Sequence, residues 1–390
     1  MNTTLKRFFL FYVFIYAAHA IYNTFLPLYF DDIGFSSMQI GTILSLGPFV
    51  AMLAQPLWGA LSDRSKTKNM ILLLLISGSA IAMLLYPLSV NFSYVLLLVC
   101  IFTLFQTSIF AISDTITLET IDRLRVGSFS HIRMGGTFGF AIMSFAFGII
   151  AERQLNSMFP IYAAIMAICF LLVLSFPKVA GHQSKGNKLS ISIMFKNRKL
   201  MVFLGFNFVL QITLGFYYSF FPIYFRDMGG SSSLLGWSMV ISSLAEVPFL
   251  LFADKIFKRI SIPVVLIGAA IATLLRWLLF YWITAPIWAL PVQLLHGAMF
   301  IVLTVTMATY INREIPKELK ASGQTFNGLL NLGVARIIGS MAGGVAIANF
   351  GLRDVFLYNA IIVLITIIVF IVIVWRMEKN NSERKAEQAS

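Results

Sequence analysis

Six ionisable side chains lie inside long apolar segments of this chain, where such groups are rare. They comprise two acids, three arginines and one histidine: Asp114, Glu246, Arg133, Arg276, Arg336 and His296. A charged side chain at the centre of a membrane helix costs roughly 2.5–3.5 kcal/mol even on lenient insertion scales, so such groups usually face a bundle interior and pair with one another. We therefore expect the six side chains to line one shared cavity and to bind a solute.

Three of these side chains could also carry a coupled proton: Glu246, His296 and Asp114. Burial favours the neutral form of a carboxyl group and a nearby cation favours the charged form, so a carboxyl beside an arginine can switch between them. Histidine titrates close to neutral pH. Glu246 is the first candidate because it lies in mid-span and Arg276, in the next span, could pair with it.

Structural roles stay open for most of the set. Arg133 begins a span and could snorkel to the membrane interface. Asp114 lies near the end of its span and could cap a helix. Arg276 could be only a counter-charge, His296 a hydrogen-bonded core residue, and Arg336 a partner for a helix end in its glycine-rich segment.

The segments around these residues have the composition of membrane helices. Hydrophobic residues make up 59% of the 390 residues and charged residues 12%, whereas charged residues are about 25% of a soluble domain. Apolar runs of about twenty residues recur, which is the length of a helix that crosses the hydrocarbon core. Only helices and closed barrels satisfy their backbone there, and these runs are too long for barrel strands. We predict an all-α integral membrane protein with twelve transmembrane helices. The predicted spans are residues 8–30, 40–61, 70–90, 94–116, 132–151, 159–177, 200–225, 234–254, 261–282, 286–311, 322–348 and 354–376.

One stretch of the sequence occurs twice. Residues 22–41 match residues 217–236 without gaps, with a proline, an aspartate and two glycines at the same places. Each pair is separated by 195 residues, which is half of 390. Self-similarity at a fixed spacing marks a repeat architecture. We predict two pseudo-symmetric six-helix bundles, comprising residues 1–177 and 200–376.

The remaining segments and the positive charges predict the orientation. Residues 178–199 are polar and basic and are expected to form a flexible linker, and residues 377–390 form a charged tail that is expected to be disordered. Outside the spans, 23 Lys and Arg residues lie on the side of the N-terminus and 3 on the other. Basic residues concentrate in cytoplasmic loops, so we place both termini and the linker in the cytoplasm and the protein in the plasma membrane.

Other function classes fit the sequence poorly. The net charge of +13 does not indicate nucleic-acid binding, because the basic residues lie between spans and not on one face. Four scattered histidines and two cysteines in apolar runs offer neither a nucleophile–base set nor metal ligands. We therefore expect no enzyme, metal or cofactor. The sequence has no Gly-x4-Gly-Lys phosphate-binding loop that would indicate ATP as the energy source. We also find no soluble output domain of the kind that a sensor carries.

The loop after the second span contains Gly59-x-Leu61-x-Asp63-Arg64. Gly59 would allow close helix approach and Asp63 could pair with a neighbouring helix end, so we expect Gly59, Asp63 and Arg64 to act in conformational change. This loop, on a twelve-span chain with a basic mid-chain linker, resembles the major facilitator superfamily. The resemblance implies the major facilitator fold and transport by alternating access.

Shorter matches resemble the lactose permease group of proton symporters and the related phenylpropionate permeases. They are Pro27-x-Tyr29, Gln55-Pro56-Leu57-Trp58-Gly59, Arg133-Met134-Gly135, Ser243-Leu244-Ala245-Glu246-Val247 and Leu275-Arg276-Trp277. This resemblance implies that Asp114 and Arg133 form a solute-binding pair. It also implies a binding and proton-coupling cluster of Glu246, Arg276 and His296. The acid that the lactose permease group carries one turn after the histidine falls at Met299 here, so another group must carry the proton.

The sequence thus favours a secondary transporter, and within that class a proton-coupled symporter. It would take up a small organic solute such as a sugar, a nucleoside or an aromatic acid. A drug or metabolite efflux antiporter is the main alternative, although residues 145–152 lack the proline of the Gly-x-x-x-Gly-Pro-x-x-Gly-Gly signature of such antiporters. A membrane enzyme or a non-transporting sensor is the alternative of another class. We expect a monomer in the lipid bilayer whose partners are a solute and protons, with no nucleic acid.

Overall fold

The computed structural model describes residues 3–125, 129–181, 197–314 and 320–389. Within these ranges twelve helical segments are long and apolar enough to cross a membrane, which confirms the predicted number of spans. No strand occurs in the same ranges. The N-terminal bundle consists of α1 (Thr3–Asp32), α2 (Ser37–Arg64), α3 (Lys68–Leu85), η1 (Tyr86–Leu88), α4 (Phe92–Gln106), α5 (Ile109–Leu124), α6 (Phe129–Ala151), η2 (Leu155–Ser157) and α7 (Met158–Leu174). The C-terminal bundle consists of α8 (Arg198–Asp227), α9 (Ser232–Ala245), α10 (Val247–Arg259), α11 (Ile262–Trp282), η4 (Pro286–Trp288), α12 (Ala289–Val292), η5 (Gln293–Ala298), α13 (Phe300–Glu314), α14 (Lys320–Gly328), the π-helical turn η7 (Leu329–Val334), α15 (Ala335–Phe350) and α16 (Leu352–Ala389).

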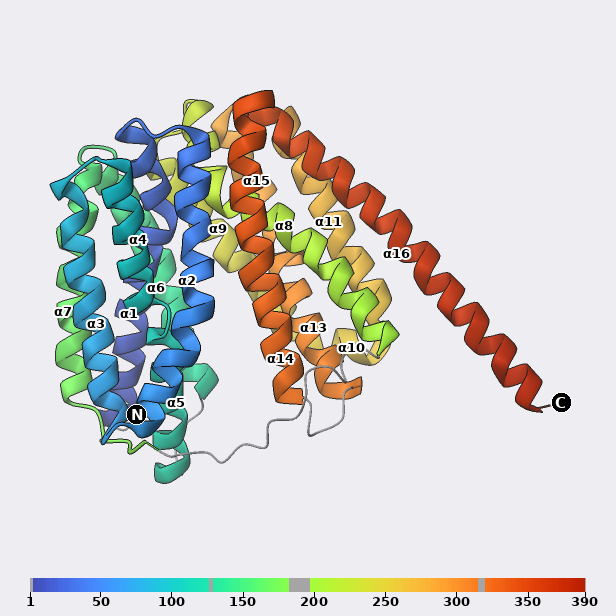
Figure 1. Ribbon diagram of the computed structural model, residues 1–390, viewed down its shortest axis with the longest axis horizontal. Coiled ribbons are helices and arrows are strands. Elements are labelled where there is room, and N and C mark those ends of the chain that lie inside the picture. Colours follow the sequence, from blue (N-terminus) through green and yellow to red (C-terminus); the bar gives the residue numbers. More distant parts are fainter. Residues whose placement is uncertain (1–2, 126–128, 182–196, 315–319, 390) are drawn as a thin grey trace.

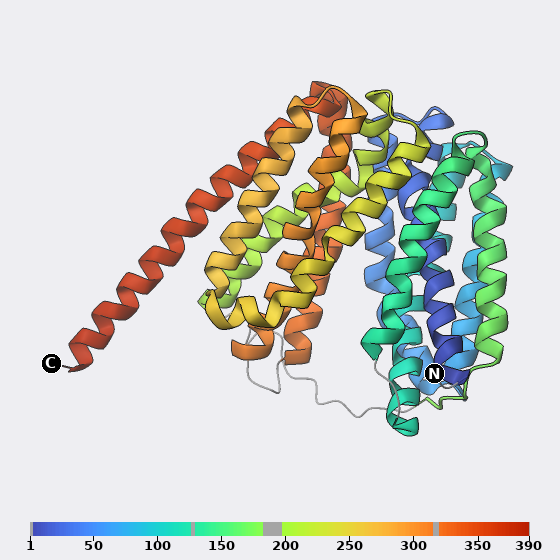
Figure 2. The same ribbon diagram turned by 180° about the vertical axis from the view of Figure 1, so that it is seen from behind.

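The two bundles lie side by side (Figure 1). Across their boundary α2 packs against α15 and α6 packs against α9. The view from behind shows α6 and α9 as neighbours (Figure 2). Both ends of the chain point to the same side of the molecule, which we call the terminal face (Figure 1). We call the opposite side, where α1 turns into α2 and α8 turns into α9, the distal face.

The two copies of the repeated stretch fold alike. Helices α1 and α8 both have 30 residues and end at aspartates that correspond in the repeat. Gly34 and Gly229 follow them, each with φ of 85°, a conformation that glycine adopts without steric cost. Ser36 and Ser231 then cap the next helix, and each side chain accepts a hydrogen bond from the backbone N–H three residues on. The internal repeat therefore corresponds to a repeated structural unit.

Glycines allow the two bundles to touch near the distal face. A Cβ atom on Gly41 of α2 would lie 2.5 Å from the carbonyl oxygen of Ser340 and 3.1 Å from Cα of Gly344 in α15. The repeat-related Gly236 of α9 meets α6 in the same way, and a Cβ on Gly148 of α6 would lie 3.3 Å from Cα of Gly236. Small residues let membrane helices pack backbone to backbone. Towards the terminal face the bundles diverge (Figures 1 and 2), so the halves are held together on the distal side.

The segments after the two bundles differ in part from expectation. Residues 182–196 of the predicted linker lie outside the described residues, but the linker begins in a fixed position. Val179 is buried, and its N–H donates a hydrogen bond of 3.1 Å to the side chain of Asn69. The expectation of disorder after Arg376 is wrong, because α16 continues as a helix to Ala389. Once a helix exists, each added residue gains a hydrogen bond without a new nucleation cost, and the tail is rich in helix-forming Glu, Lys, Arg and Ala.

The glycine contacts predict the effect of a larger side chain on the distal face. Gly236→Leu should separate α9 from α6 and raise, several-fold, the rate at which an impermeant thiol reagent reaches the cavity from the distal side. The reporter is a single cysteine at Asn23, which lines the cavity, in a background without Cys100 and Cys169. The control is Gly268→Leu, since no described residue lies within 4 Å of a Cβ at Gly268. Equal labelling rates in Gly236→Leu and in the parent protein would contradict the closing role of these contacts.

Candidate functional site

A cavity with two compartments lies between the bundles. The compartments measure about 400 and 410 Å³ and share four lining residues, His19, Asn23, Tyr218 and Arg336. We call the first the apolar compartment, because mostly aliphatic and aromatic side chains of α1, α2 and α4 line it. We call the second the polar compartment, because charged and hydroxyl side chains of both bundles line it.

The polar compartment holds most of the ionisable residues that the sequence singled out. The four that line it are Arg133 of α6, Glu246 between α9 and α10, His296 of η5 and Arg336 of α15. The other two, Asp114 and Arg276, line neither compartment. The expectation of a shared cavity thus holds for the four lining residues, which come from both bundles, and not for Asp114 and Arg276.

A break in the eighth span exposes Glu246 to the cavity. Helix α9 ends at Ala245 and α10 begins at Val247, so Glu246 lies at the junction. Pro248 causes the break, because proline has no N–H for the helical hydrogen bond and its ring clashes with the carbonyl four residues earlier. The Glu246 side chain is 23% exposed, which leaves the carboxyl group open to water in the cavity.

Gly297 allows His296 to reach Glu246. A Cβ on Gly297 would lie 2.8 Å from the backbone nitrogen of Glu246 and would overlap the carbonyl of Ala245. Because glycine has no side chain, η5 packs directly against the break, and Nε2 of His296 lies 3.4 Å from Oε1 of Glu246. The same nitrogen lies 3.1 Å from the hydroxyl oxygen of Tyr218.

Arg276 is fully buried on the other side of His296. Its Nη1 donates to Nδ1 of His296 over 2.8 Å, and its Nη2 donates to Oε1 of Gln293. Its guanidinium carbon lies 4.2 Å from the ring centroid of Tyr217, a cation–π contact. The expected direct pair between Arg276 and Glu246 is therefore wrong, because His296 lies between them and Arg276 binds neutral partners.

These contacts determine which nitrogen of His296 carries the hydrogen. A guanidinium group can only donate hydrogen bonds, so Nδ1 of His296 must accept one from Arg276. In the neutral ring Nε2 then carries the hydrogen and faces Glu246 and Tyr218. A second proton on His296 would have to enter at Nδ1, against a donor 2.8 Å away. His296 is therefore arranged as a hydrogen-bond donor to the cavity wall.

Asp114 and Arg133, which the resemblance implied as a solute-binding pair, make no ion pair with each other among the described residues. Asp114 of α5 instead accepts a hydrogen bond from the hydroxyl of Tyr12 in α1. The guanidinium of Arg133 lies over the ring of Tyr16, with 4.1 Å between its carbon and the ring centroid. Tyr16 and Arg133 both line the polar compartment, so the tyrosine face positions the arginine at the cavity while Asp114 is engaged outside it.

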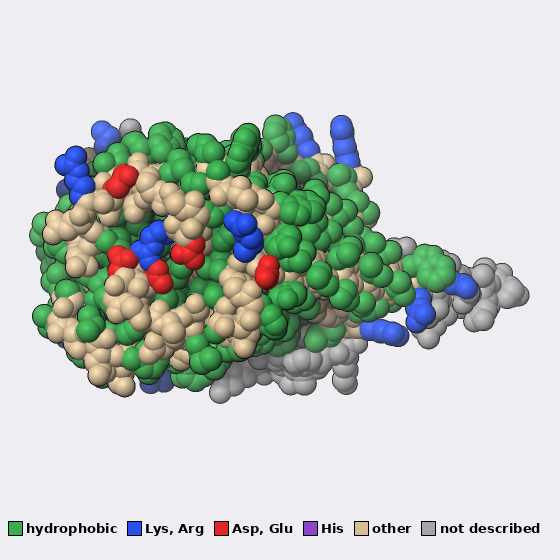
Figure 3. Space-filling view, turned by 90° about the horizontal axis from the view of Figure 1, so that it is seen from above, with side chains coloured by type: hydrophobic (Ala, Val, Ile, Leu, Met, Phe, Trp, Pro, Cys, Tyr) green, Lys and Arg blue, Asp and Glu red, His purple; other side chains and the backbone are tan. Residues whose placement is uncertain are grey.

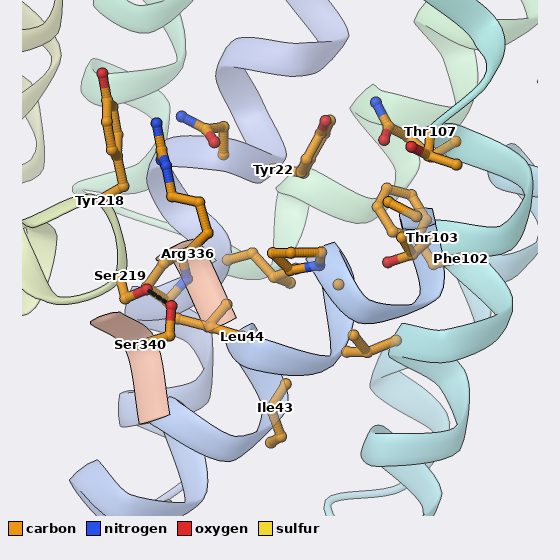
Figure 4. A pocket seen from close by; sticks show the side chains of 18 of the residues that line it. Tyr22, Ile43, Leu44, Phe102, Thr103, Thr107, Tyr218, Ser219, Arg336 and Ser340 are labelled. Carbon is orange, nitrogen blue, oxygen red and sulfur yellow. Dashed lines mark hydrogen bonds between the residues drawn. The ribbon is translucent and has the colours of Figure 1, made fainter. Parts of the chain in front are cut away.

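Arg336 stands where the two compartments meet. Its guanidinium carbon lies 4.1 Å from the ring centroid of Tyr218, and its Nε has no hydrogen-bond partner among the described residues. Figure 4 shows Arg336 beside Tyr218, with Tyr22 on the opposite side and the aliphatic Ile43 and Leu44 of α2 below. A guanidinium at this position can bind a polar group while an apolar group occupies the compartment next to it.

The predicted conformational loop lies far from the cavity, at the terminal-face end of α2. Asp63 and Arg64 are exposed there. The expected close helix approach at Gly59 is wrong for this structure, since no atom of the part of the chain that the structure describes lies within 4 Å of a Cβ at that position. The close approach is instead at Gly181, where a Cβ would lie 2.6 Å from the carbonyl oxygen of Ser65. The beginning of the linker thus packs on the loop.

Comparison with known proteins identifies the chain. The model of the MFS_1 like family matches residues 5–358. The chain belongs to this family of major facilitator transporters. The transporter is 23% identical over 380 residues to the maltose permease of Geobacillus stearothermophilus, with 96% of each chain covered. It is 28% identical over 369 residues to the multidrug resistance protein MdtG of Citrobacter koseri, with 89% of each covered. Its fold matches the crystal structure of the nucleoside transporter NupG with a TM-score of 0.86, at 18% identity over 95% of this chain and 99% of that chain. The predicted major facilitator fold is confirmed.

Sequence reasoning missed three residues of the transporter's site. Gln293 is fully buried, accepts hydrogen bonds from Arg276 and Tyr217, and donates one to Ser238. Gln293 precedes the histidine by one helical turn, so the spacing could have revealed it. Gly297 and the cavity-lining Asn23 gave no comparable signal.

The role of Gln293 predicts a loss of stability on substitution. Gln293→Leu leaves one Arg276 nitrogen without its acceptor, and a hydrogen bond to a charged group is worth about 1.5–3 kcal/mol. We expect the free energy of unfolding of the transporter in detergent to fall by at least that amount, because the bonds of Gln293 to Tyr217 and Ser238 are lost as well. Ser238→Ala removes only a neutral bond to the same amide and should cost about 0.5–1.5 kcal/mol. If both variants unfolded like the parent protein, Gln293 would not be holding Arg276.

Proposed function

We propose that the transporter is a proton-coupled symporter that takes up a small amphipathic organic anion. The observation that carries the proposal is the charge in the polar compartment, where two arginines and one carboxyl group line the same space. The excess of Lys and Arg on the terminal face supports a cytoplasmic location for that face. The closed distal face would then lie outside the cell, and we take the membrane to be the plasma membrane.

The two arginines support an anionic solute. Arg133 and Arg336 come from different bundles, and each stacks on a tyrosine with 4.1 Å between guanidinium carbon and ring centroid. Among the described residues neither has a carboxylate within 4.0 Å. A guanidinium offers a planar fork of donors that matches a carboxylate. A solute carboxylate between them would bind both halves of the transporter at once.

The apolar compartment supports an apolar body for the same solute. Leu26, Pro27, Leu44 and Phe102 line it, and it adjoins the polar compartment at Arg336. Ligand sites combine apolar walls with a few polar groups that fix orientation. An anion with a ring or short aliphatic body would place its charge at the arginines and its body against α2 and α4.

Glu246 is the best candidate for the proton carrier. Its carboxyl group is partly open to the cavity. In His296, by contrast, Nδ1 is the nitrogen that could accept a second proton, and it already accepts a hydrogen bond from Arg276. Asp114 is the weaker third candidate because it lines neither compartment. A charged Glu246 would offset part of the positive charge in the compartment, and a protonated Glu246 would leave the full charge of both arginines for the solute. The binding of a proton and of an anion would then favour each other.

Rocking of the two bundles would deliver the proton and the solute to the cytoplasm. Repeat architectures of this type expose a site between their halves to each side in turn. The glycine contacts close the distal side here, so this conformation corresponds to one end of that cycle. Asp63 and Arg64, with Gly59, would act on the conformational step, since they lie at the terminal face and not in the cavity.

Efflux is the second candidate function. The similarity to MdtG, a multidrug resistance protein, favours it, and the similarity to a maltose permease favours uptake. The direction of proton-driven movement distinguishes the two. An antiporter would expel the solute when the outside is acidic, and a symporter would accumulate it.

Transport into right-side-out membrane vesicles tests the proposal. We expect aromatic and short aliphatic carboxylates to accumulate only when the outside is more acidic than the inside, and neutral sugars and nucleosides not to compete. Arg336→Gln should weaken binding of carboxylates at least tenfold. Accumulation of neutral solutes alone would contradict the anion, and gradient-driven expulsion would favour efflux.

Glu246→Gln tests the proton carrier. The amide cannot release a proton, so gradient-driven accumulation should be abolished while exchange of solute across the membrane persists, because exchange needs no net deprotonation. Glu152→Gln, on the distal loop after α6, is the matched control and should accumulate normally. A Glu246→Gln variant that still accumulates solute on a proton gradient would refute the assignment and direct the test to His296 and Asp114.

Asp63→Asn tests the loop. We expect the transport rate to fall at least several-fold while the equilibrium affinity for the solute stays within about twofold, because the loop is remote from the cavity. Asp122→Asn, an exposed acid on the same face, should leave both unchanged. Equal losses of affinity and rate in Asp63→Asn would speak against a purely conformational role.

A further inference from the structure

An ion-pair cluster joins the two bundles on the distal face. Arg226, in the last turn of α8, forms ion pairs with Asp31 and Asp32 in the last turn of α1. The side chains are partly exposed, at 33% for Arg226, 31% for Asp31 and 47% for Asp32. Figure 3, which looks onto this face, shows acidic and basic side chains next to one another. Helices α1 and α8 belong to different bundles and are in contact.

The internal repeat makes this pairing informative. Asp31 and Arg226 are 195 residues apart, as are Asp32 and Asp227, so Arg226 occupies in the second copy the place of Asp31 in the first. Equivalent residues near the pseudo-symmetry axis face each other. With aspartate in both copies, four carboxylates would meet there and repel one another. The change of charge between the copies converts that repulsion into attraction between the bundles.

We propose that Arg226, Asp31 and Asp32 form an electrostatic latch that holds the distal side closed. Opening the distal side must separate α1 from α8, so the latch has to break in each transport cycle. Its partly exposed charges interact through a high effective dielectric and are screened by salt, which suits a contact that must break repeatedly. In the empty transporter the latch shifts the conformational equilibrium towards the conformation that is closed on the distal side.

The latch and the glycine contacts have separate physical origins. The glycine contacts between α2 and α15 and between α6 and α9 depend on backbone packing and not on charge. The latch acts between α1 and α8 and depends on charge. Removing the latch therefore biases the transporter towards distal opening while every residue of the glycine contacts and of the cavity stays the same.

A charge swap tests the proposal in the full-length transporter. The reporter is again a single cysteine at Asn23, labelled from the distal side by an impermeant thiol reagent, so the readout does not depend on the solute or the proton. Arg226→Asp should raise the labelling rate several-fold. Asp31→Arg combined with Arg226→Asp should restore the parental rate, because the pseudo-symmetry then places the arginine of α1 against two aspartates of α8, one of them Asp227.

Two comparisons make the result decisive. Arg353→Asp, at an exposed arginine on the same face at the start of α16, changes the charge equally and should leave labelling unchanged. In the parent protein labelling should rise with salt concentration, and in Arg226→Gln, which removes the pairs without adding a charge, it should already be high and insensitive to salt. The proposal is overturned if Arg226→Asp and Arg226→Gln label at the parental rate, or if the swap labels as fast as Arg226→Asp alone.

Discussion

The whole arrangement depends on one constraint, that a polar group in the interior of a membrane protein must find its partners within the protein. Arg276 shows how the constraint is met without an opposing carboxylate. Its positive charge is distributed over the Gln293 amide, the His296 ring and the face of Tyr217. Because a guanidinium only donates, it determines the hydrogen position on His296 and hence what faces Glu246. A buried network thus extends from the core to the cavity wall.

The boundary between the bundles follows a different rule, because it has to open and close. Backbone contacts at glycines and partly exposed ion pairs contribute to it, together with one pair of aromatic rings, Phe145 of α6 and Trp237 of α9, whose centroids are 4.7 Å apart. Where helices meet at glycines they can separate with little repacking of side chains, and exposed charges regain water when they part. The large aromatic residues are concentrated instead inside each bundle, where Phe8, Phe25, Trp277 and Phe280 are fully buried.

The cavity is formed where helices are irregular. Glu246 lies at the break caused by Pro248, His296 is in the 3-10 segment η5, and Arg336 is the second residue after the π-helical turn η7. Irregular backbone at membrane depth is tolerated where it is enclosed by protein or lines a cavity. Each break also changes the direction of a side chain. In a continuous helix the same side chain would point at a different angle and not into the cavity. The two halves share the repeat at α1 and α8, but α2 is continuous where its counterpart breaks at Glu246, so the site is asymmetric although the fold is pseudo-symmetric.

The sequence alone determined the class of the fold, the number of spans and the repeat, because hydrocarbon thickness and helix rise impose a length on every apolar run. The sequence also identified the ionisable residues as candidates, because a charged side chain inside a span is energetically costly and seldom occurs without a structural or functional role. Only the tertiary structure decided the partners. Arg276 was expected to meet Glu246 and meets His296 and Gln293 instead, and Asp114 is bound by Tyr12 and kept out of the cavity. Which side chains meet depends on helix rotation, on the break at Pro248 and on close approach at Gly297, and these depend on packing between segments far apart in the sequence. A spacing along one helix does not contain that information.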